Sequence, residues 1–168
     1  MPLLDGVTPV AEAIGAVNTI VKRDGKLIGH NTDAAGLLAD LHTHGVKIQD
    51  RVVLVLGAGG SARAAVAACA GMGAKIKFIA RRRDQAESLA SDFQLPTSNV
   101  FDLTINDLTR ASHDCALILN CTPLGMSPNI DSSPWFDSVP FPKEAFVYDL
   151  VYNPRETKLV KQARAQGL

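Results

Sequence analysis

Positions 51 to 63 read Arg51-Val-Val-Leu-Val-Leu-Gly57-Ala-Gly59-Gly60-Ser-Ala62-Arg63. The apolar, β-branched half is typical of a strand buried on both faces, and the small residues after it predict a helix. Gly57 allows a tight turn, Gly59 allows the backbone to approach an anion, and Ala62 permits close packing of helix on strand. The helix would begin near Gly60 and direct unpaired amide hydrogens and its positive dipole end at that anion. The segment therefore predicts the phosphate-binding turn of a dinucleotide-binding domain.

From Arg51 onward, strand and helix patterns alternate along the chain. Strands are expected at 52–56, 75–80, 99–102, 115–120 and 145–150, and helices at 60–71, 83–93, 105–108 and 156–166. Strands separated by helices predict an α/β fold with a doubly wound, Rossmann-like parallel sheet in the order 3-2-1-4-5. The Pro- and Ser-rich stretch 122–143 is expected to form a long loop over the carboxyl ends of the strands, where loops usually carry function.

The first fifty residues have a different pattern. Ala16 to His30 forms two alternating runs around Asp24-Gly25, which predicts a β-hairpin, and residues 33–44 are expected to form a connecting helix. A lone two-stranded hairpin is marginal in water, so its strands need a partner sheet that the sequence does not obviously supply. We therefore expect residues 1–44 to be the remnant of a second domain and residues 45–168 to form the nucleotide-binding domain.

The composition restricts the classes of function. The 168 residues are 46% hydrophobic with a formal net charge of zero, which suits one buried core and gives no large field to attract nucleic acid. Apolar stretches are too short to span a membrane and the N-terminus lacks a signal pattern, so we expect a cytoplasmic protein without a membrane partner. The three cysteines are expected to be free thiols, and His42 and His44 without a third ligand predict no metal site.

The end of the second expected strand indicates the cofactor. Domains that prefer NAD usually place an acid there, whereas this chain reads Ala80-Arg81-Arg82-Arg83. Guanidinium groups bind a 2′-phosphate through paired hydrogen bonds, so the pattern favours NADP. Asp84 is an alternative ribose-binding acid, although we expect it to cap the following helix. The alternative explanation is that the three arginines are a run of solvent-exposed charged residues that binds no ligand.

Five motifs together resemble those of shikimate dehydrogenases. They are Gly15-Ala-Val-Asn18-Thr, Gly29-His-Asn31-Thr32-Asp33-Ala-Ala-Gly36, Gly57-Ala-Gly59-Gly60, Asn120-Cys-Thr122-Pro123-Leu124-Gly125-Met126 and Asp149-Leu-Val-Tyr152-Asn-Pro154-Arg-Glu-Thr157. They follow the family's order across nearly the whole chain. The resemblance implies reversible, NADPH-dependent reduction of a small molecule, 3-dehydroshikimate, to shikimate in the chorismate pathway to aromatic amino acids.

The resemblance also implies roles for individual residues. Asn18 and Asp33 would bind substrate hydroxyls, Asp33 would also belong to a catalytic lysine–aspartate pair, and Tyr152 would approach the substrate from the cofactor side. The cofactor residues would be Gly57, Ala58, Gly59, Gly60, Ser61 and Ala62 at the pyrophosphate, Arg81 and Arg82 at the 2′-phosphate, and Thr122, Pro123, Leu124 and Leu150 along the nicotinamide half. The family usually has Asn-Arg-Thr in place of Ala80-Arg81-Arg82, so the central arginine is kept while the adenosine contacts differ.

The expected reaction is chemically consistent with these roles. Hydride transfer to a ketone builds negative charge on its oxygen, and a lysine near a carboxylate can supply both a proton and a hydrogen bond there. Structural explanations stay open for the same residues: Asn18 as a hairpin side chain, Asp33 as a helix N-cap, and Tyr152 as a residue packed at a strand end.

The family resemblance also predicts what the chain lacks. In the family, the catalytic lysine lies upstream of Gly15, and Lys22 and Lys26 match no motif. We therefore expect a truncated cofactor-binding core with little or no turnover alone, whose unpaired hairpin edges favour a homodimer. The alternatives are a non-catalytic NADP-binding module, a quinate/shikimate dehydrogenase paralogue, and a nucleotide domain from another pathway.

Overall fold

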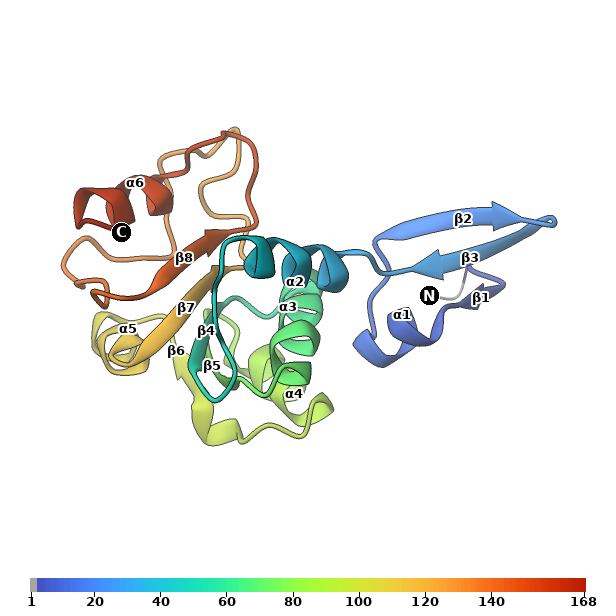
Figure 1. Cartoon of the computed structure of the whole chain (residues 1–168), viewed down its shortest axis with the longest axis horizontal. Coiled ribbons are helices and arrows are strands. Elements are labelled where there is room, and N and C mark those ends of the chain that lie inside the picture. Colours follow the sequence, from blue (N-terminus) through green and yellow to red (C-terminus); the bar gives the residue numbers. More distant parts are fainter. Residues whose placement is uncertain (1–2) are drawn as a thin grey trace.

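The computed structural model describes residues 3–168 and contains two sheets (Figure 1). The strands are β1 (Gly6–Val7), β2 (Thr19–Arg23), β3 (Lys26–His30), β4 (Val52–Leu56), β5 (Lys75–Ala80), β6 (Val100–Asp102), β7 (Cys115–Asn120) and β8 (Phe146–Asp149). The helices are α1 (Pro9–Ile14), α2 (Asp33–Thr43), α3 (Gly60–Gly71), α4 (Arg83–Asp92), α5 (Ile105–Ser112) and α6 (Lys158–Ala165), with a 3₁₀ turn at Thr97–Asn99. No helix among these residues is long and apolar enough to cross a bilayer.

The larger sheet has the order β6-β5-β4-β7-β8, and all of its neighbouring strands are parallel. Counted along the chain, this is the predicted order 3-2-1-4-5, and the predicted fold class is confirmed. Residues Val53 to Leu56 are 0% exposed because the strand is covered on both faces. Helices α2, α3 and α4 pack on one face, while α5, α6 and part of the β7–β8 connection pack on the other.

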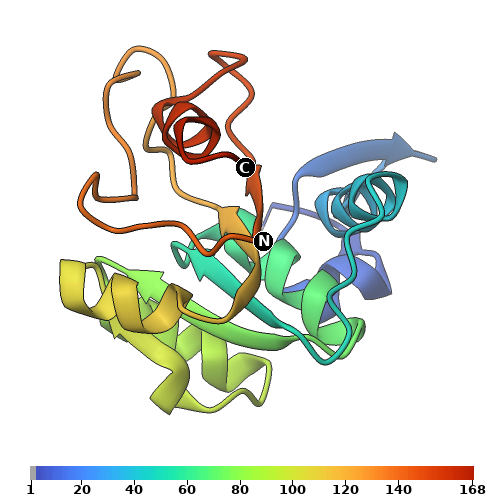
Figure 2. The same ribbon diagram turned by 60° about the vertical axis from the view of Figure 1, so that its left-hand side comes forward.

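The connection between β7 and β8 contains no helix or strand, as the sequence predicts. Figure 2 shows it arching around α6. Trp135 anchors it, since its ring stacks on Phe141 with centroids 4.2 Å apart and its Nε1 donates to the Val139 carbonyl at 2.8 Å. The loop is therefore held by an apolar cluster that it shares with the larger sheet, α5 and α6.

The smaller sheet has the order β1-β3-β2 and extends away from the five-stranded sheet (Figure 1). The predicted hairpin is present as β2 and β3, which pair in antiparallel register around Asp24-Gly25. The expectation that the hairpin lacks a partner strand is wrong, because β1 pairs with β3 through Gly6 and Val7. A strand of this length has no periodicity to detect in a sequence.

Helix α1 was also missed by sequence reasoning, although its start carries a signal. Thr8 is the N-cap and accepts a hydrogen bond from Ala11 N, and Pro9 occupies the first turn. Helix α5 is longer than the expected 105–108 and continues to Ser112. These differences lie in short elements, where tertiary packing outweighs local pattern.

One side chain ties the N-terminal segment to the larger sheet's helices. Arg63 on α3 donates from Nε to the Ile14 carbonyl at 2.8 Å and pairs with Asp92 on α4 at 2.8 Å. Gly15 follows with a φ of +71°, and a Cβ there would lie 2.6 Å from the Arg63 guanidinium. The positive φ favours glycine at this position, and a larger residue would displace the guanidinium from the Ile14 carbonyl.

Candidate functional site

The turn between β4 and α3 has the geometry expected of a phosphate cradle. Gly57 has a φ of +105°, and a Cβ there would lie 3.0 Å from Thr122 Cγ2 and 3.3 Å from the Cys121 carbonyl carbon. A Cβ on Gly59 would meet no atom within 4 Å, so the backbone is open on that side. Gly59 caps α3 without any side-chain hydrogen bond, which leaves the first amide hydrogens of the helix available to an anion.

Ala62 plays the packing role that the sequence predicts for it. It is 0% exposed and belongs to the core between α3 and the sheet. This close approach of helix to strand is what the third small residue of the turn makes possible.

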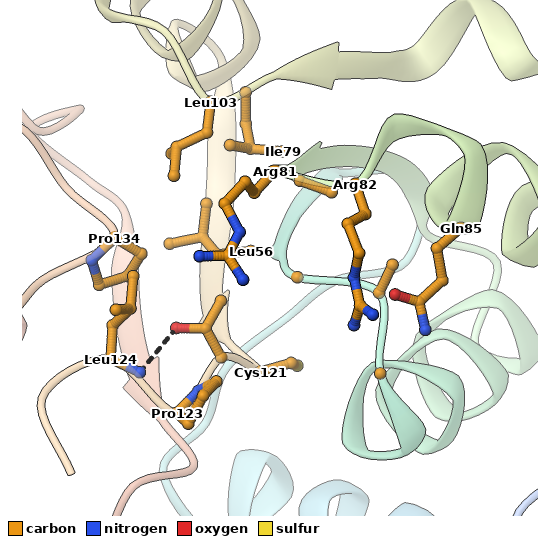
Figure 3. A pocket seen from close by; sticks show the side chains of 15 residues that line it. Leu56, Ile79, Arg81, Arg82, Gln85, Leu103, Cys121, Pro123, Leu124 and Pro134 are labelled. Carbon is orange, nitrogen blue, oxygen red and sulfur yellow. Dashed lines mark hydrogen bonds between the residues drawn. The ribbon is translucent and has the colours of Figure 1, made fainter.

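A depression of about 310 Å³ opens beside this turn (Figure 3). It lies at the carboxyl ends of β4, β5 and β7, and its floor includes Leu56 and Ile79. Of the expected cofactor residues, its lining contains Gly57, Ala58, Gly59, Arg81, Arg82, Thr122, Pro123 and Leu124. The structure thus brings together three segments that are distant in the sequence. Gln85, Leu103 and Pro134 also line it and were not anticipated.

The three consecutive arginines have different surroundings. Arg83 pairs with Glu87 at 2.8 Å and with Asp102 at 3.3 Å. Within residues 3–168, no carboxylate lies within 4.0 Å of the guanidinium group of Arg81 or Arg82. Both side chains extend into the depression (Figure 3). Two guanidinium groups therefore line the depression, while the third stabilises the start of α4.

Asp84 does not cap α4, contrary to our expectation. The N-cap is Arg82, with no side-chain cap hydrogen bond, and Asp84 lies in the first helical turn. Its carboxylate is still favourably placed near the positive end of the helix dipole, which explains its presence there.

Asn120 organises the loop that follows β7. It is 0% exposed, and its Oδ1 accepts from Thr122 N at 2.9 Å and from Thr122 Oγ1 at 2.6 Å. Thr122 Oγ1 in turn accepts from Leu124 N at 3.2 Å, the contact drawn in Figure 3. These bonds hold residues 122–124 as one wall of the depression.

Asp149, at the end of β8, is the centre of a second set of bonds. Its Oδ1 accepts from Asn120 Nδ2 at 2.9 Å and Val151 N at 2.9 Å, and its Oδ2 accepts from Thr157 Oγ1 at 2.6 Å. Burial raises the pKa of the carboxyl, while the hydrogen bonds from Thr157, Val151 and Asn120 act in the opposite direction. Sequence reasoning assigned no role to Asn120, Asp149 or Thr157. The signal for Asn120 and Asp149 was a polar residue at the end of an apolar strand, and the signal for Thr157 was a threonine directly before a helix.

A second depression of about 380 Å³ adjoins the first, since Cys121, Thr122 and Pro123 line both. Ser61, Leu150 and Tyr152 also line it. Tyr152 is 88% exposed, so the alternative that it is packed at a strand end is wrong. Gly60 and Ala62 line neither depression.

Asn18 and Asp33 lie together where the smaller sheet meets α2. Asn18 Nδ2 donates to Asp33 Oδ1 at 2.5 Å and to Thr32 Oγ1 at 3.0 Å. Neither residue lines either of the depressions. The alternative that Asp33 caps α2 is wrong, because the amides of Asp33 and Ala34 donate to Asn31 Oδ1 at 3.1 and 3.4 Å. The Asp33 carboxylate is therefore not used by the helix terminus.

No protein-family model matches the chain. It is 45% identical to a shikimate dehydrogenase (NADP(+)) of Symbiobacterium thermophilum, over 100% of this chain and 59% of that protein. It is 41% identical to the enzyme of the same name from Salinibacter ruber, over 99% of this chain and 61% of that protein. The chain thus spans about three fifths of the length of these relatives.

Solved structures give the same result. A shikimate 5-dehydrogenase from Thermus thermophilus, in complex with NADP(H) and shikimate, superposes with a TM-score of 0.83 at 36% identity, over 98% of this chain and 59% of that one. A quinate dehydrogenase from Corynebacterium glutamicum, in complex with NAD, gives 0.80 at 29% identity, over 99% and 60%. Along its whole length, the chain is therefore homologous to the shikimate dehydrogenases.

Proposed function

We propose that this chain is the NADP-binding part of a shikimate dehydrogenase, which interconverts 3-dehydroshikimate and shikimate. The observation that supports it best is the single depression lined by the glycine turn and by two arginines without carboxylate partners. The relatives named above carry NADP(+) in their name, and the Thermus structure contains NADP(H). Bound NADPH would supply the hydride for reduction of the ketone.

The cofactor would lie across the carboxyl ends of the larger sheet. Backbone amides from Gly57 to Ala62 would hold the pyrophosphate, and Gly59 leaves open space for its approach. Arg81 and Arg82 would bind the 2′-phosphate in charge-assisted bonds. The nicotinamide half would lie along the two depressions, against Thr122, Pro123, Leu124 and Leu150.

The substrate would meet residues on the other side of the nicotinamide half. We propose that Asn18 and Asp33 bind its hydroxyls, that Asp33 serves in the catalytic pair, and that Tyr152 contacts it from the cofactor side. The hydrogen bond between Asn18 and Asp33 would keep the two groups at a fixed spacing. Because the lysine of that pair is expected outside the matched motifs, the 168 residues alone should show little or no turnover.

Further parts of this proposal concern organisation and setting. Residues 1–44 would belong to a substrate domain and residues 45–168 to the NADP-binding domain, with small molecules as ligands and the cytoplasm as location. A homodimer through the hairpin would use the outer edge of β2, which has no neighbouring strand within residues 3–168. Ile20, 59% exposed, would be covered in it. A purely monomeric sedimentation profile at high protein concentration would argue against the dimer.

Calorimetric titration of the 168-residue chain with NADPH and NADH tests the cofactor proposal. We expect NADPH to bind and NADH to bind at least about ten-fold more weakly, since the extra phosphate gains charge-assisted hydrogen bonds. Circular dichroism would verify folding beforehand. A folded chain that binds no NADPH at millimolar concentration would refute the proposal.

A quinate-active paralogue is a second candidate, because the Corynebacterium quinate dehydrogenase has the same fold at 29% identity. Its structure contains NAD, whereas Arg81 and Arg82 here favour the phosphorylated cofactor. Initial rates of a full-length protein containing this chain, measured with shikimate and with quinate, separate the two. A higher kcat/KM for quinate would favour the second candidate.

A further inference from the structure

The proposed function determines which end of the cofactor lies near β8. The role inferred below for Asp149, at the end of that strand, rests on the proposed function. The order of the larger sheet reverses between β4 and β7, which is the switch point where a doubly wound fold binds its dinucleotide. Arg81 and Arg82 follow β5, on one side of that point. If they bind the adenosine 2′-phosphate, the nicotinamide must extend to the other side, over the ends of β7 and β8.

Asp149 is the last residue of β8, and the residues directly after it line the second depression. All three groups that donate to its carboxylate are neutral: an amide side chain, a backbone amide and a hydroxyl. Within the described residues, no lysine, arginine or histidine nitrogen lies within 4.0 Å of it. The carboxylate is a half-buried negative charge without a counter-charge.

Oxidised and reduced nicotinamide differ by one unit of charge. The ring of NADP⁺ carries a positive charge, which disappears when a hydride adds to it. A fixed negative charge beside the ring therefore stabilises the oxidised form and has little effect on the reduced form, and burial strengthens this difference relative to water. Neutral hydrogen-bond donors screen such a charge only partly.

We propose that Asp149 determines the redox preference of the site, favouring NADP⁺ over NADPH by the field of its uncompensated carboxylate. By linkage, the same field shifts the equilibrium of the bound reactants toward ketone reduction, since that direction creates the positive ring. Asp149 acts without touching the reacting atoms and is a positioning and specificity-determining residue.

A purely structural role is the competing explanation, because Asp149 also connects β7, β8 and the N-cap of α6. Thr157 donates to Asp149 and also accepts from Val160 N at 3.3 Å. Loss of this scaffold would weaken the binding of both cofactor forms alike. The ratio of the two affinities separates the explanations, because only the charge discriminates between the forms.

The experiment measures the affinities of NADP⁺ and NADPH by calorimetry for the wild-type chain and its variants. Asp149→Asn is nearly isosteric and removes the charge, and we expect it to lower the ratio of NADP⁺ affinity to NADPH affinity about ten-fold. Asp149→Ser is a smaller neutral variant that gives the same test if the first does not fold. Thr157→Val is the matched control: it removes the two hydrogen bonds of Thr157 Oγ1, the one donated to Asp149 Oδ2 and the one accepted from Val160 N, but keeps the charge, and it should leave the ratio within about two-fold.

The exchange variant Asn120→Asp/Asp149→Asn keeps one carboxylate in the cluster and should recover most of the wild-type ratio. Equal weakening of both forms by Asp149→Asn or Asp149→Ser would overturn the inference while leaving the proposed cofactor in place. A wild-type chain that is folded and binds neither form would instead refute the proposed function, and the inference with it.

Discussion

Replacement of Gly57 by alanine is the most direct test of the proposed phosphate-binding turn between β4 and α3. At a φ of +105° an alanine is strained by about 1–3 kcal/mol. Its Cβ would also lie 3.0 Å from Thr122 Cγ2 and 3.3 Å from the Cys121 carbonyl carbon, and shifting that backbone adds about 1 kcal/mol. The free energy of unfolding should therefore fall by about 2–4 kcal/mol, which for a chain of this size lowers Tm by roughly 4–16 °C.

Gly59→Ala is the matched control, because its Cβ would meet no atom within 4 Å. Its Tm should stay within about 2 °C of wild type, since a surface change of this kind alters stability by about 0.5 kcal/mol or less. Its methyl group would nevertheless occupy the wall of the depression, so NADPH affinity should fall at least about ten-fold.

Thermal unfolding followed by circular dichroism, with calorimetric titration of NADPH, gives both readouts. Gly57→Ala should lose stability and affinity together, whereas Gly59→Ala should lose affinity alone. If Gly57→Ala melted at the wild-type temperature, the assigned turn geometry would be incorrect. If Gly59→Ala bound NADPH with wild-type affinity, the phosphates would have to lie elsewhere.

Three further predictions concern the arginines and the thiols. Arg81→Ala and Arg82→Ala should each weaken NADPH binding about 10- to 100-fold, with little effect on NADH binding. Arg83→Ala is the control: it loses the ion pairs to Glu87 and Asp102 and should leave both affinities nearly unchanged. Calorimetric titrations of the three variants with both cofactors measure these affinities. Burial raises the pKa of Cys69 and Cys115 to about 12, so both thiols should react with alkylating reagents far more slowly in the folded chain than in urea at pH 8; equal rates would contradict the burial. The pKa of each thiol in the folded chain lies above the ordinary value of 9.0, so the thiols ionise more readily in the unfolded chain. The contribution of the buried, protonated thiols to the free energy of unfolding is therefore fully present below pH 9 and is lost as the pH rises toward about 12. Denaturant titrations across that pH range would detect the loss.

The larger sheet was predictable from the sequence because its central strands are buried on both faces. Strands β4, β5 and β7 and helix α3 have the expected bounds. The continuous apolar runs of β4 and β7 end at Gly57 and Asn120, which leaves few alternatives for those two strands. Gly57, Gly59, Arg81 and Arg82 were predictable as neighbours for another reason. They follow the ends of β4 and β5, and the carboxyl ends of parallel strands meet at one edge of the sheet.

Other features depend on contacts that no local pattern records. Strand β1 pairs with a residue stretch about twenty positions later, and its two residues carry no signal of their own. The side chain of Asn31, not that of Asp33, accepts hydrogen bonds from the first amides of α2, because the chain before the helix turns the Asn31 amide oxygen toward them. The bond between Asn120 and Asp149 joins residues 29 positions apart, and only strand pairing brings them together.

The position of Arg63 has a mechanical consequence. It stands on the first turn of α3, where its own amide donates to the Gly59 carbonyl at 3.1 Å, and its side chain holds the Ile14 carbonyl. The helix that faces the cradle therefore also sets the angle at which the hairpin leaves the body of the molecule. Swinging the hairpin would first require releasing this guanidinium, so the arm that carries Asn18 is braced against the helices of the larger sheet.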